Sequence, residues 1–159
     1  MPQAYEEILE GETHLRLAPA APHELLCNRL HAWVRAALPA GSPLRLPPRR
    51  TPFELPPRSR VSPDLALTHA DDGRLYLAVE VVQPGDHNRD TVVKKQLYMD
   101  VRLPRLWIVD SRYHNVEIYG TGEFGFRLET ILANHHPLTD LQLPGFSRTM
   151  DELFAKPCP

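Results

Sequence analysis

Two acids and one lysine lie in or near segments whose other residues are mostly apolar, as expected for a buried chain. Asp64 follows Pro63 and directly precedes an apolar run, and Glu80 lies among valines in "LYLAVEVV" (75–82). Lys94 follows further along, one helical turn before Tyr98. Buried carboxylates lose hydration and repel each other, so they need a positive partner. These residue types indicate either a metal site or a buried ion pair.

The strand pairing decides whether the two acids meet. Residues 65–68 and 75–82 have strand-like composition and flank the turn signal "ADDG", which predicts a β-hairpin. With a three-residue loop, Asp64 lies directly opposite Glu80. With a two-residue loop, Asp64 lies opposite Val81, and the two carboxylates point to opposite faces.

We favour the three-residue loop, formed by residues 71–73, because it also sets Ala66 opposite Ala78. This small pair leaves room beside the acids. Side chains alternate along a strand, so Tyr76 is expected on the face of the acids and Leu75 on the other face.

Two facing carboxylates are suited to Mg²⁺ or Mn²⁺. Mg²⁺ prefers octahedral oxygen coordination by one or two carboxylates, water and substrate phosphate. A metal held by Asp64 and Glu80 would polarise a phosphodiester, and Lys94 would orient or deprotonate the attacking water. Tyr98 lies on the same helix face as Lys94. The residues leave open a second interpretation, in which Lys94 forms a buried salt bridge with one or both acids.

The surrounding elements predict a single domain spanning residues 1–159, of the α/β (α+β) class, with a central mixed β-sheet flanked by helices. Apolar periodicity predicts helices, and short apolar runs predict further strands. The expected helices are 23–38, 91–101 and 150–155, and the further strands are 106–110, 116–120 and 126–130.

Charge and composition limit the partners. The net charge is −2, so any contact with nucleic acid must come from a local patch. One such patch lies in the proline-rich segment 45–60, whose arginines are candidates for DNA binding: Arg45, Arg49, Arg50, Arg58 and Arg60. Cys27 and Cys158 are expected to be free thiols. With no apolar run suited to a signal peptide or a membrane span, we expect a cytoplasmic protein.

Several motifs together resemble the PD-(D/E)XK nuclease superfamily, and within it the bacterial restriction-endonuclease-like group known as the Uma family. They are "PD" at 63–64, "EV" at 80–81, K-x-x-x-Y at 94–98 and "LPRLWIVD" at 103–110. The likeness covers most of the chain, including "EEILEGE" at 6–12 and "LQLPGFSRTMDELF" at 141–154.

The resemblance implies a restriction-endonuclease-like fold, DNA as substrate, Mg²⁺ or Mn²⁺ as cofactor and frequent homodimers. It implies Asp64 and Glu80 as metal ligands and Lys94 as the catalytic lysine, supplied from the helix because Val82 stands at the usual lysine position. It also implies supporting roles for Glu12 and His23, with Tyr98 beside Lys94.

The leading hypothesis is therefore a metal-dependent DNA endonuclease. The alternatives are a catalytically inactive nuclease-fold protein that binds nucleic acid or a protein partner, and a structural protein with a buried ion pair. If the acids repel, Asp64→Asn is expected to leave stability unchanged or improved. If they form an ion pair, it is expected to cost about 3–5 kcal/mol.

Overall fold

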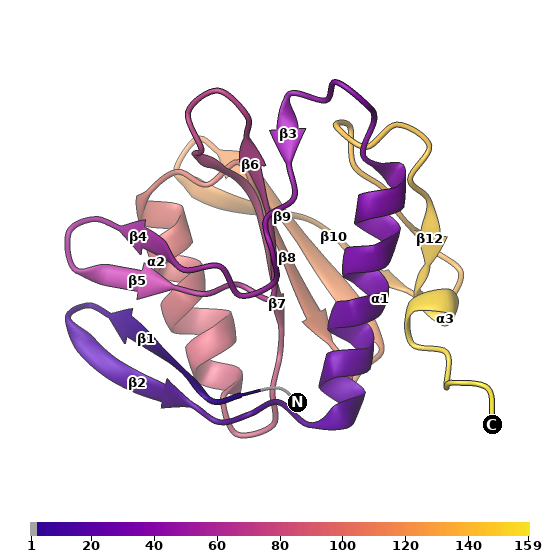
Figure 1. Cartoon of the computed structure of the whole chain (residues 1–159), viewed down its shortest axis with the longest axis horizontal. Helices are drawn as coiled ribbons and strands as arrows, with labels where there is room; N and C mark the ends of the chain where they lie inside the picture. Colours follow the sequence, from indigo (N-terminus) through magenta and orange to yellow (C-terminus); the bar gives the residue numbers. More distant parts are fainter. Residues whose placement is uncertain (1–2) are drawn as a thin grey trace.

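A six-stranded mixed sheet with the order β10-β9-β8-β7-β6-β3 lies at the centre of the computed structural model, which describes residues 3–159 (Figure 1). Only β7 and β8 pair in parallel. The strands are β3 (Leu44–Arg45), β6 (Leu65–His69), β7 (Leu75–Val81), β8 (Arg105–Asp110), β9 (Asn115–Gly122) and β10 (Gly125–Ala133). The predicted α/β class with a central mixed sheet is confirmed.

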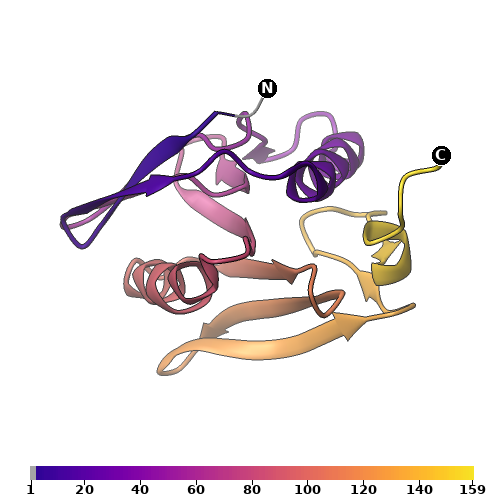
Figure 2. The same cartoon turned by 90° about the horizontal axis from the view of Figure 1, so that it is seen from below.

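Helices cover both faces of this sheet (Figure 2). On one face, α1 (Ala21–Ala37) packs its apolar stripe against Leu77 and Val79 of β7. On the other face, α2 (Lys94–Asp100) packs against Ala78 and the neighbouring β8. The strand alternation thus divides the core into an α1 side and an α2 side.

A wide helical turn leads into α2. The π-helical segment η1 (Arg89–Val93) precedes it, and the backbone N–H of Lys94 donates to Arg89 O. The predicted helix at 91–101 therefore begins earlier, and its first turn is wider than an α-helix. Such π turns are frequent at functional sites.

A second, four-stranded sheet with the order β2-β1-β5-β4 lies over the α2 side. Its strands are β1 (Tyr5–Leu9), β2 (Glu12–Arg16), β4 (Phe53–Leu55) and β5 (Ser59–Val61). Neither β1 nor β2 is among the strands expected from the sequence. Leu9, Leu55 and Val61 are buried against α2 and the central sheet. This sheet brings the N-terminal hairpin over Glu80.

The C-terminal segment packs beside α1 through β11 (Pro137–Leu138), β12 (Arg148–Thr149) and α3 (Met150–Leu153). Thr149 and Glu152 form a capping box at the start of α3. No helix within residues 3–159 is long and apolar enough to cross a membrane.

The hairpin register places the two acids as predicted. Ala66 pairs with Ala78, and Leu65 pairs with Val79. One residue further in the same register, Asp64 falls opposite Glu80.

The turn of this hairpin differs from the prediction. The His69 N–H donates to Arg74 O at 2.8 Å, so the loop comprises residues 70–73 rather than 71–73. A β-bulge at Tyr76 then restores the register, because Thr68 pairs with Leu75 but Leu67 pairs with Leu77. The bulge also exchanges the faces: Leu75 packs on the α2 side and Tyr76 on the α1 side. The predicted faces of these two residues were wrong for that reason.

Candidate active site

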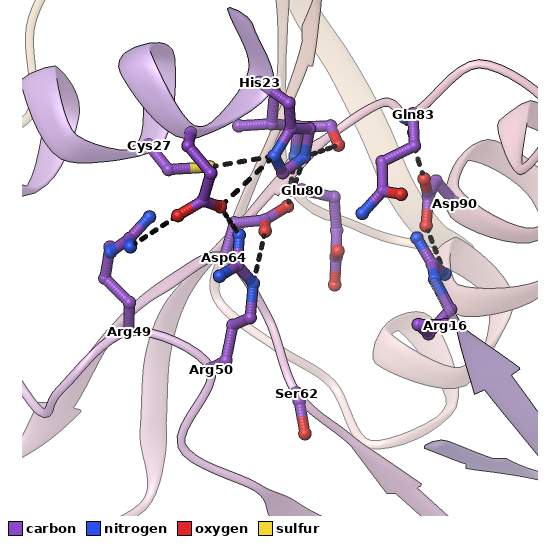
Figure 3. A network of polar contacts seen from close by, with 12 residues as sticks. Arg16, His23, Cys27, Arg49, Arg50, Ser62, Asp64, Glu80, Gln83 and Asp90 are labelled. Atoms are coloured by element: carbon purple, nitrogen blue, oxygen red, sulfur yellow. Dashed lines mark hydrogen bonds and ion pairs between the residues drawn. The ribbon is translucent and has the colours of Figure 1, made fainter. Parts of the chain in front are cut away.

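Asp64 and Glu80 are held by the ends of β6 and β7. Asp64 directly precedes β6, and its Oδ2 accepts a hydrogen bond from the Val81 N–H at 2.8 Å. Glu80 lies within β7, on the α2 side. Only 3% of Asp64 and 2% of Glu80 is exposed. Figure 3 shows the two side chains side by side.

The predicted lysine and tyrosine both reach Glu80. Lys94 Nζ lies 2.6 Å from Glu80 Oε1, and the Tyr98 hydroxyl donates to the same oxygen at 2.5 Å. Lys94 and Tyr98 are fully buried. No residue of the described range 3–159 donates a hydrogen bond to Glu80 Oε2, so this oxygen remains free for another ligand.

Glu7 is the acid that sequence reasoning missed. It is fully buried, and its Oε1 lies 2.7 Å from Lys94 Nζ and accepts from the Ser62 N–H at 2.8 Å. Alternation in β1 buries Glu7 with Leu9 while Glu6 is exposed. The pattern "YEEIL" carried this signal, since an acid shares a face with apolar residues.

Glu12, the predicted supporting acid, lies on the other strand of the same hairpin and points to solvent. Its side chain is 82% exposed, and its carboxylate lies 3.8 Å from His14. We therefore correct this assignment and place Glu7 in the site instead of Glu12.

Arg16 ties the hairpin to η1. Its Nη1 lies 3.2 Å from Glu7 Oε2 and 2.8 Å from Asp90 Oδ1. Its Nε lies 3.2 Å from Asp86 Oδ2. Asp90 also accepts from the Gln83 N–H at 3.4 Å (Figure 3). Arg16 and Asp90 are almost fully buried, so this is an internal charge network.

A second group of charges borders Asp64 from α1 and from the loop after β3. His23 Nε2 lies 2.9 Å from Val81 O and 3.6 Å from Asp64 Oδ2, as predicted for a residue near the site (Figure 3). Arg50 Nε lies 3.4 Å from Asp64 Oδ1. Glu24 pairs with both Arg50 and Arg49, the latter at 2.8 Å. Two of the five candidate arginines thus belong to the site itself.

The remaining three arginines lie elsewhere. Arg45 and Arg58 are exposed, and Arg60 pairs with Glu54 at 2.5 Å while half of its side chain stays exposed. A DNA-binding role for these residues stays a prediction.

The carboxyl groups of Asp64 and Glu80, the two predicted metal ligands, have different pKa values in the folded protein. Burial, together with Glu7, Asp90 and Asp64, raises the pKa of Glu80 to about 8, against the opposing charge of Lys94. Burial also disfavours ionisation of Asp64, but His23, the Val81 N–H and Arg50 bring its pKa down to about 2. Asp64 is therefore ionised at neutral pH, whereas Glu80 readily takes up a proton.

Lys94 keeps its proton. Burial favours the neutral amine, but the charges of Glu80 and Glu7 hold the pKa of Lys94 above its ordinary value. A lysine with a raised pKa is a hydrogen-bond donor and a cation, and it is a poor general base.

One observation fits a divalent cation at Asp64 and Glu80. Asp64 Oδ1 is buried and has no hydrogen bond within residues 3–159, although Arg50 Nε lies 3.4 Å away. The neighbouring donor groups are the carboxylates of Asp64 and Glu80, which suit Mg²⁺ or Mn²⁺.

Asp64 and Glu80 do not line the cavity next to α2. A cavity of about 800 Å³ lies between β4, the β6–β7 loop and the end of α2, lined by residues such as Phe53, His69 and Arg102. This cavity contains none of the charged residues around Asp64 and Glu80. Next to Asp64, Arg49 and Arg50 keep 22% and 14% of their side chains exposed, so this border is partly open.

Comparisons with known proteins agree with this fold. The sequence model of the Uma2 family, described as "Putative restriction endonuclease", matches residues 2–151. A crystal structure from Anabaena variabilis, described as a putative nuclease belonging to DUF820, superimposes with a TM-score of 0.76 at 11% identity, covering 94% of this chain and 89% of that chain. No curated protein matches the sequence. Because the family match spans nearly the whole chain, this protein belongs to the Uma2 family of restriction-endonuclease-like proteins.

Proposed function

We propose that this protein is a Mg²⁺- or Mn²⁺-dependent DNA endonuclease that hydrolyses phosphodiester bonds at Asp64 and Glu80. The observation that carries the proposal is the buried carboxylate of Asp64, set opposite Glu80 by the hairpin register. Its Oδ1 has no hydrogen bond within residues 3–159, and the nearby cation, Arg50 Nε, lies 3.4 Å away. A buried charged oxygen that lacks a hydrogen bond is costly unless a ligand completes its contacts. Membership of the Uma2 family supports nuclease chemistry.

Asp64 Oδ1 and Glu80 Oε2 are the oxygens that would hold the metal. When bound, the ion would polarise the scissile phosphate and lower the pKa of a bound water. Asp64 is already ionised, whereas Glu80 would give up the proton that its raised pKa retains near neutral pH. The Tyr98 hydroxyl and Lys94 hold Glu80 Oε1, which leaves Oε2 available.

Lys94 acts as a donor and a cation in this proposal. Its ammonium group lies between Glu7 and Glu80 and remains protonated. It would donate an N–H to the attacking water or to a phosphate oxygen, and it would offset the negative charge that develops on the phosphate. Lys94 is not proposed to deprotonate the water, because a lysine with a raised pKa holds its proton.

The substrate would approach from the side of Arg49 and Arg50. Both guanidinium groups are partly exposed. Arg50 contacts Asp64 directly, and Glu24 pairs with both Arg50 and Arg49. Guanidinium groups form bidentate hydrogen bonds with phosphate, so a phosphate would compete with Glu24 for Arg49 and Arg50. Arg45, Arg58 and Arg60 would extend the contact along the DNA backbone.

Plasmid cleavage combined with metal binding tests the proposal. Supercoiled plasmid is incubated with the wild type, Asp64→Asn and Glu80→Gln in Mg²⁺ or Mn²⁺, with and without chelator, and binding of each metal is measured by calorimetry. The wild type is expected to bind metal and nick the plasmid, and both variants are expected to lose both activities. A wild type that binds neither metal would refute the proposal.

A second candidate function is a catalytically inactive nuclease-fold protein that binds nucleic acid or a protein partner. The burial of Lys94 between Glu7 and Glu80 favours it, because Lys94 already contacts both acids without a metal. This candidate predicts that the wild type and Asp64→Asn bind DNA equally and that neither cleaves it in Mn²⁺.

A further inference from the structure

His23, Cys27 and Asp64 bring three different metal-binding groups together. His23 and Cys27 lie one turn apart on α1, and one ligand atom from each of the three residues lies within 4.8 Å of the others. The three residues are 6%, 1% and 3% exposed. Figure 3 shows the imidazole of His23 between the thiol of Cys27 and the carboxylate of Asp64.

The hydrogen bonds of His23 leave one ring nitrogen facing the thiol. Val81 O lies 2.9 Å from Nε2 and can only accept, so Nε2 carries a proton. Nδ1 lies 3.5 Å from Cys27 Sγ. Metal-binding histidines typically donate their other N–H to a carbonyl or carboxylate, which fixes the ring. The backbone carbonyl of β7 therefore already supplies this support.

We propose that Cys27, His23 and Asp64 form a Zn²⁺ site that shares only Asp64 with the Mg²⁺ site. Zn²⁺ prefers tetrahedral sulfur, nitrogen and carboxylate ligands at about 2.0–2.3 Å, which places them about 3.3–3.8 Å apart. The three ligand atoms lie within 4.8 Å of one another, so each side chain would move closer when Zn²⁺ binds. A carboxylate oxygen of Asp64 supplies the third ligand.

Glu24 completes the fourth position. Its Oε1 lies 3.7 Å from His23 Nδ1, and its pairing with Arg49 and Arg50 holds it at the partly open border of the site. On binding, the thiol proton of Cys27 leaves to solvent and a Zn–S bond replaces it.

The two sites select different ions. The thiolate and imidazole favour Zn²⁺, whereas Asp64 and Glu80 alone offer only oxygen and suit Mg²⁺. Since Asp64 belongs to both sets, Zn²⁺ at Cys27 removes a ligand from the Mg²⁺ site. Inhibition of cleavage by Zn²⁺ rests on the proposed nuclease function, but Zn²⁺ binding itself does not.

Titration with Co²⁺ and Zn²⁺ in the absence of Mg²⁺ tests the site. A thiolate bound to Co²⁺ gives a charge-transfer absorption, and Zn²⁺ affinity is measured by competition with a chromophoric chelator. The wild type is expected to bind one ion with this absorption. Cys27→Ser and Cys27→Ala are expected to lose the absorption and about tenfold or more in Zn²⁺ affinity, since loss of supporting residues alone costs that much. Circular dichroism verifies that the variants are folded.

Cys158→Ser is the matched control, because Cys158 is the other free thiol and is exposed. It is expected to keep both the absorption and the affinity. If Cys158→Ser loses them, or if Cys27→Ser and Cys27→Ala bind Zn²⁺ as tightly as the wild type, the proposed site is wrong.

Glu80→Gln and Asp64→Asn separate this site from the proposed nuclease site. Glu80→Gln is expected to lose Mg²⁺ but keep Zn²⁺, and Asp64→Asn is expected to weaken both. A wild type that binds Zn²⁺ through Cys27 but never binds Mg²⁺ would overturn the nuclease proposal alone. A wild type that binds Mg²⁺ but not Zn²⁺ would overturn the Zn²⁺ site alone.

Discussion

Lys94 and Glu7 form a fully buried ion pair, with 2.7 Å between Nζ and Oε1, across 87 positions of sequence. Glu7 lies on the N-terminal hairpin and Lys94 on α2. The hairpin is therefore part of the candidate site, because it supplies an acid that contacts Lys94 together with Glu80. A change in this hairpin alters the charge balance at the proposed metal ligands.

Glu7→Gln is expected to lower the free energy of unfolding by about 3–5 kcal/mol, because it leaves Arg16 and Lys94 buried with one acid fewer. Urea denaturation measures the change. Glu12→Gln on the same hairpin is the control and is expected to change stability by less than about 0.5 kcal/mol, since its side chain is 82% exposed. Equal effects of the two substitutions would contradict the assignment of Glu7 to the site.

Asp64→Asn and Glu80→Gln are expected to differ in stability, although both are expected to abolish the proposed cleavage. The fold favours the ionised form of Asp64, through His23, the Val81 N–H and Arg50, so its neutral replacement costs about 1–3 kcal/mol. The fold raises the pKa of Glu80 above its ordinary value, so Glu80→Gln is expected to cost less than Asp64→Asn. Thermal denaturation at pH 7 without metal measures both.

This expectation replaces the simple repulsion hypothesis for Asp64. Repulsion between the acids raises the pKa of Glu80, whereas Asp64 has its own cation, Arg50, and lies beside His23. A more stable Asp64→Asn protein would show that Arg50 and His23 do not compensate the charge of Asp64.

The elements that carry Asp64, Glu80, Lys94 and Tyr98 could be predicted because their signals are local. Alternation, a turn signal and a K-x-x-x-Y spacing determine which side chains share a face. The register of the acids was correct although the predicted turn was not, because the bulge at Tyr76 compensates for the longer loop. A bulge depends on packing around the strand, and no residue type in the sequence predicts it.

The contacts of Glu7 and of Arg50 could not be predicted for a different reason. Glu7 meets Lys94, and Arg50 meets Glu24 and Asp64, only through the three-dimensional fold. The N-terminal hairpin has strands of five residues and carries several charges, so its strand signal was weak. Glu7 and Glu12 are both glutamates on the same hairpin, and only the strand faces seen in the structure distinguish the buried one from the exposed one.

Stability without metal is expected to fall as the pH rises from about 4.5 to about 8. The folded-state pKa of Glu80 is raised above its ordinary value of 4.5, so the folded protein binds a proton more tightly than the unfolded chain over this interval. The stabilising effect of that proton is present below pH 4.5 and is lost through pH 8. Glu80→Gln is expected to flatten this slope.

Metal binding is expected to release a proton in the same interval. Calorimetry of Mg²⁺ binding at pH 7 in buffers of different ionisation enthalpy measures it, and Glu80→Asp is a variant that keeps a titrating ligand. A wild type whose binding enthalpy does not depend on the buffer would mean that Glu80 is ionised before the metal arrives.

Lys94→Met is expected to separate metal binding from catalysis. It removes the donor proposed to contact the water or the phosphate, so the cleavage rate falls by about 10²–10³. It also removes the cation next to Glu80 and Glu7, so Mg²⁺ affinity stays unchanged or rises, and Mg²⁺ stabilises this variant more than it stabilises the wild type. Plasmid cleavage, calorimetry and thermal denaturation with and without Mg²⁺ measure these three effects.

Lys95→Met provides the matched comparison, because Lys95 Nζ lies 4.9 Å from the ring of Tyr119 and away from the acids. It is expected to keep cleavage near the wild-type rate. If Lys94→Met loses Mg²⁺ binding together with cleavage, Lys94 serves to position Glu80 and does not act on the substrate. If it keeps both, the buried lysine only neutralises Glu7 and Glu80, and the donor to the attacking water must come from the side of Arg49 and Arg50.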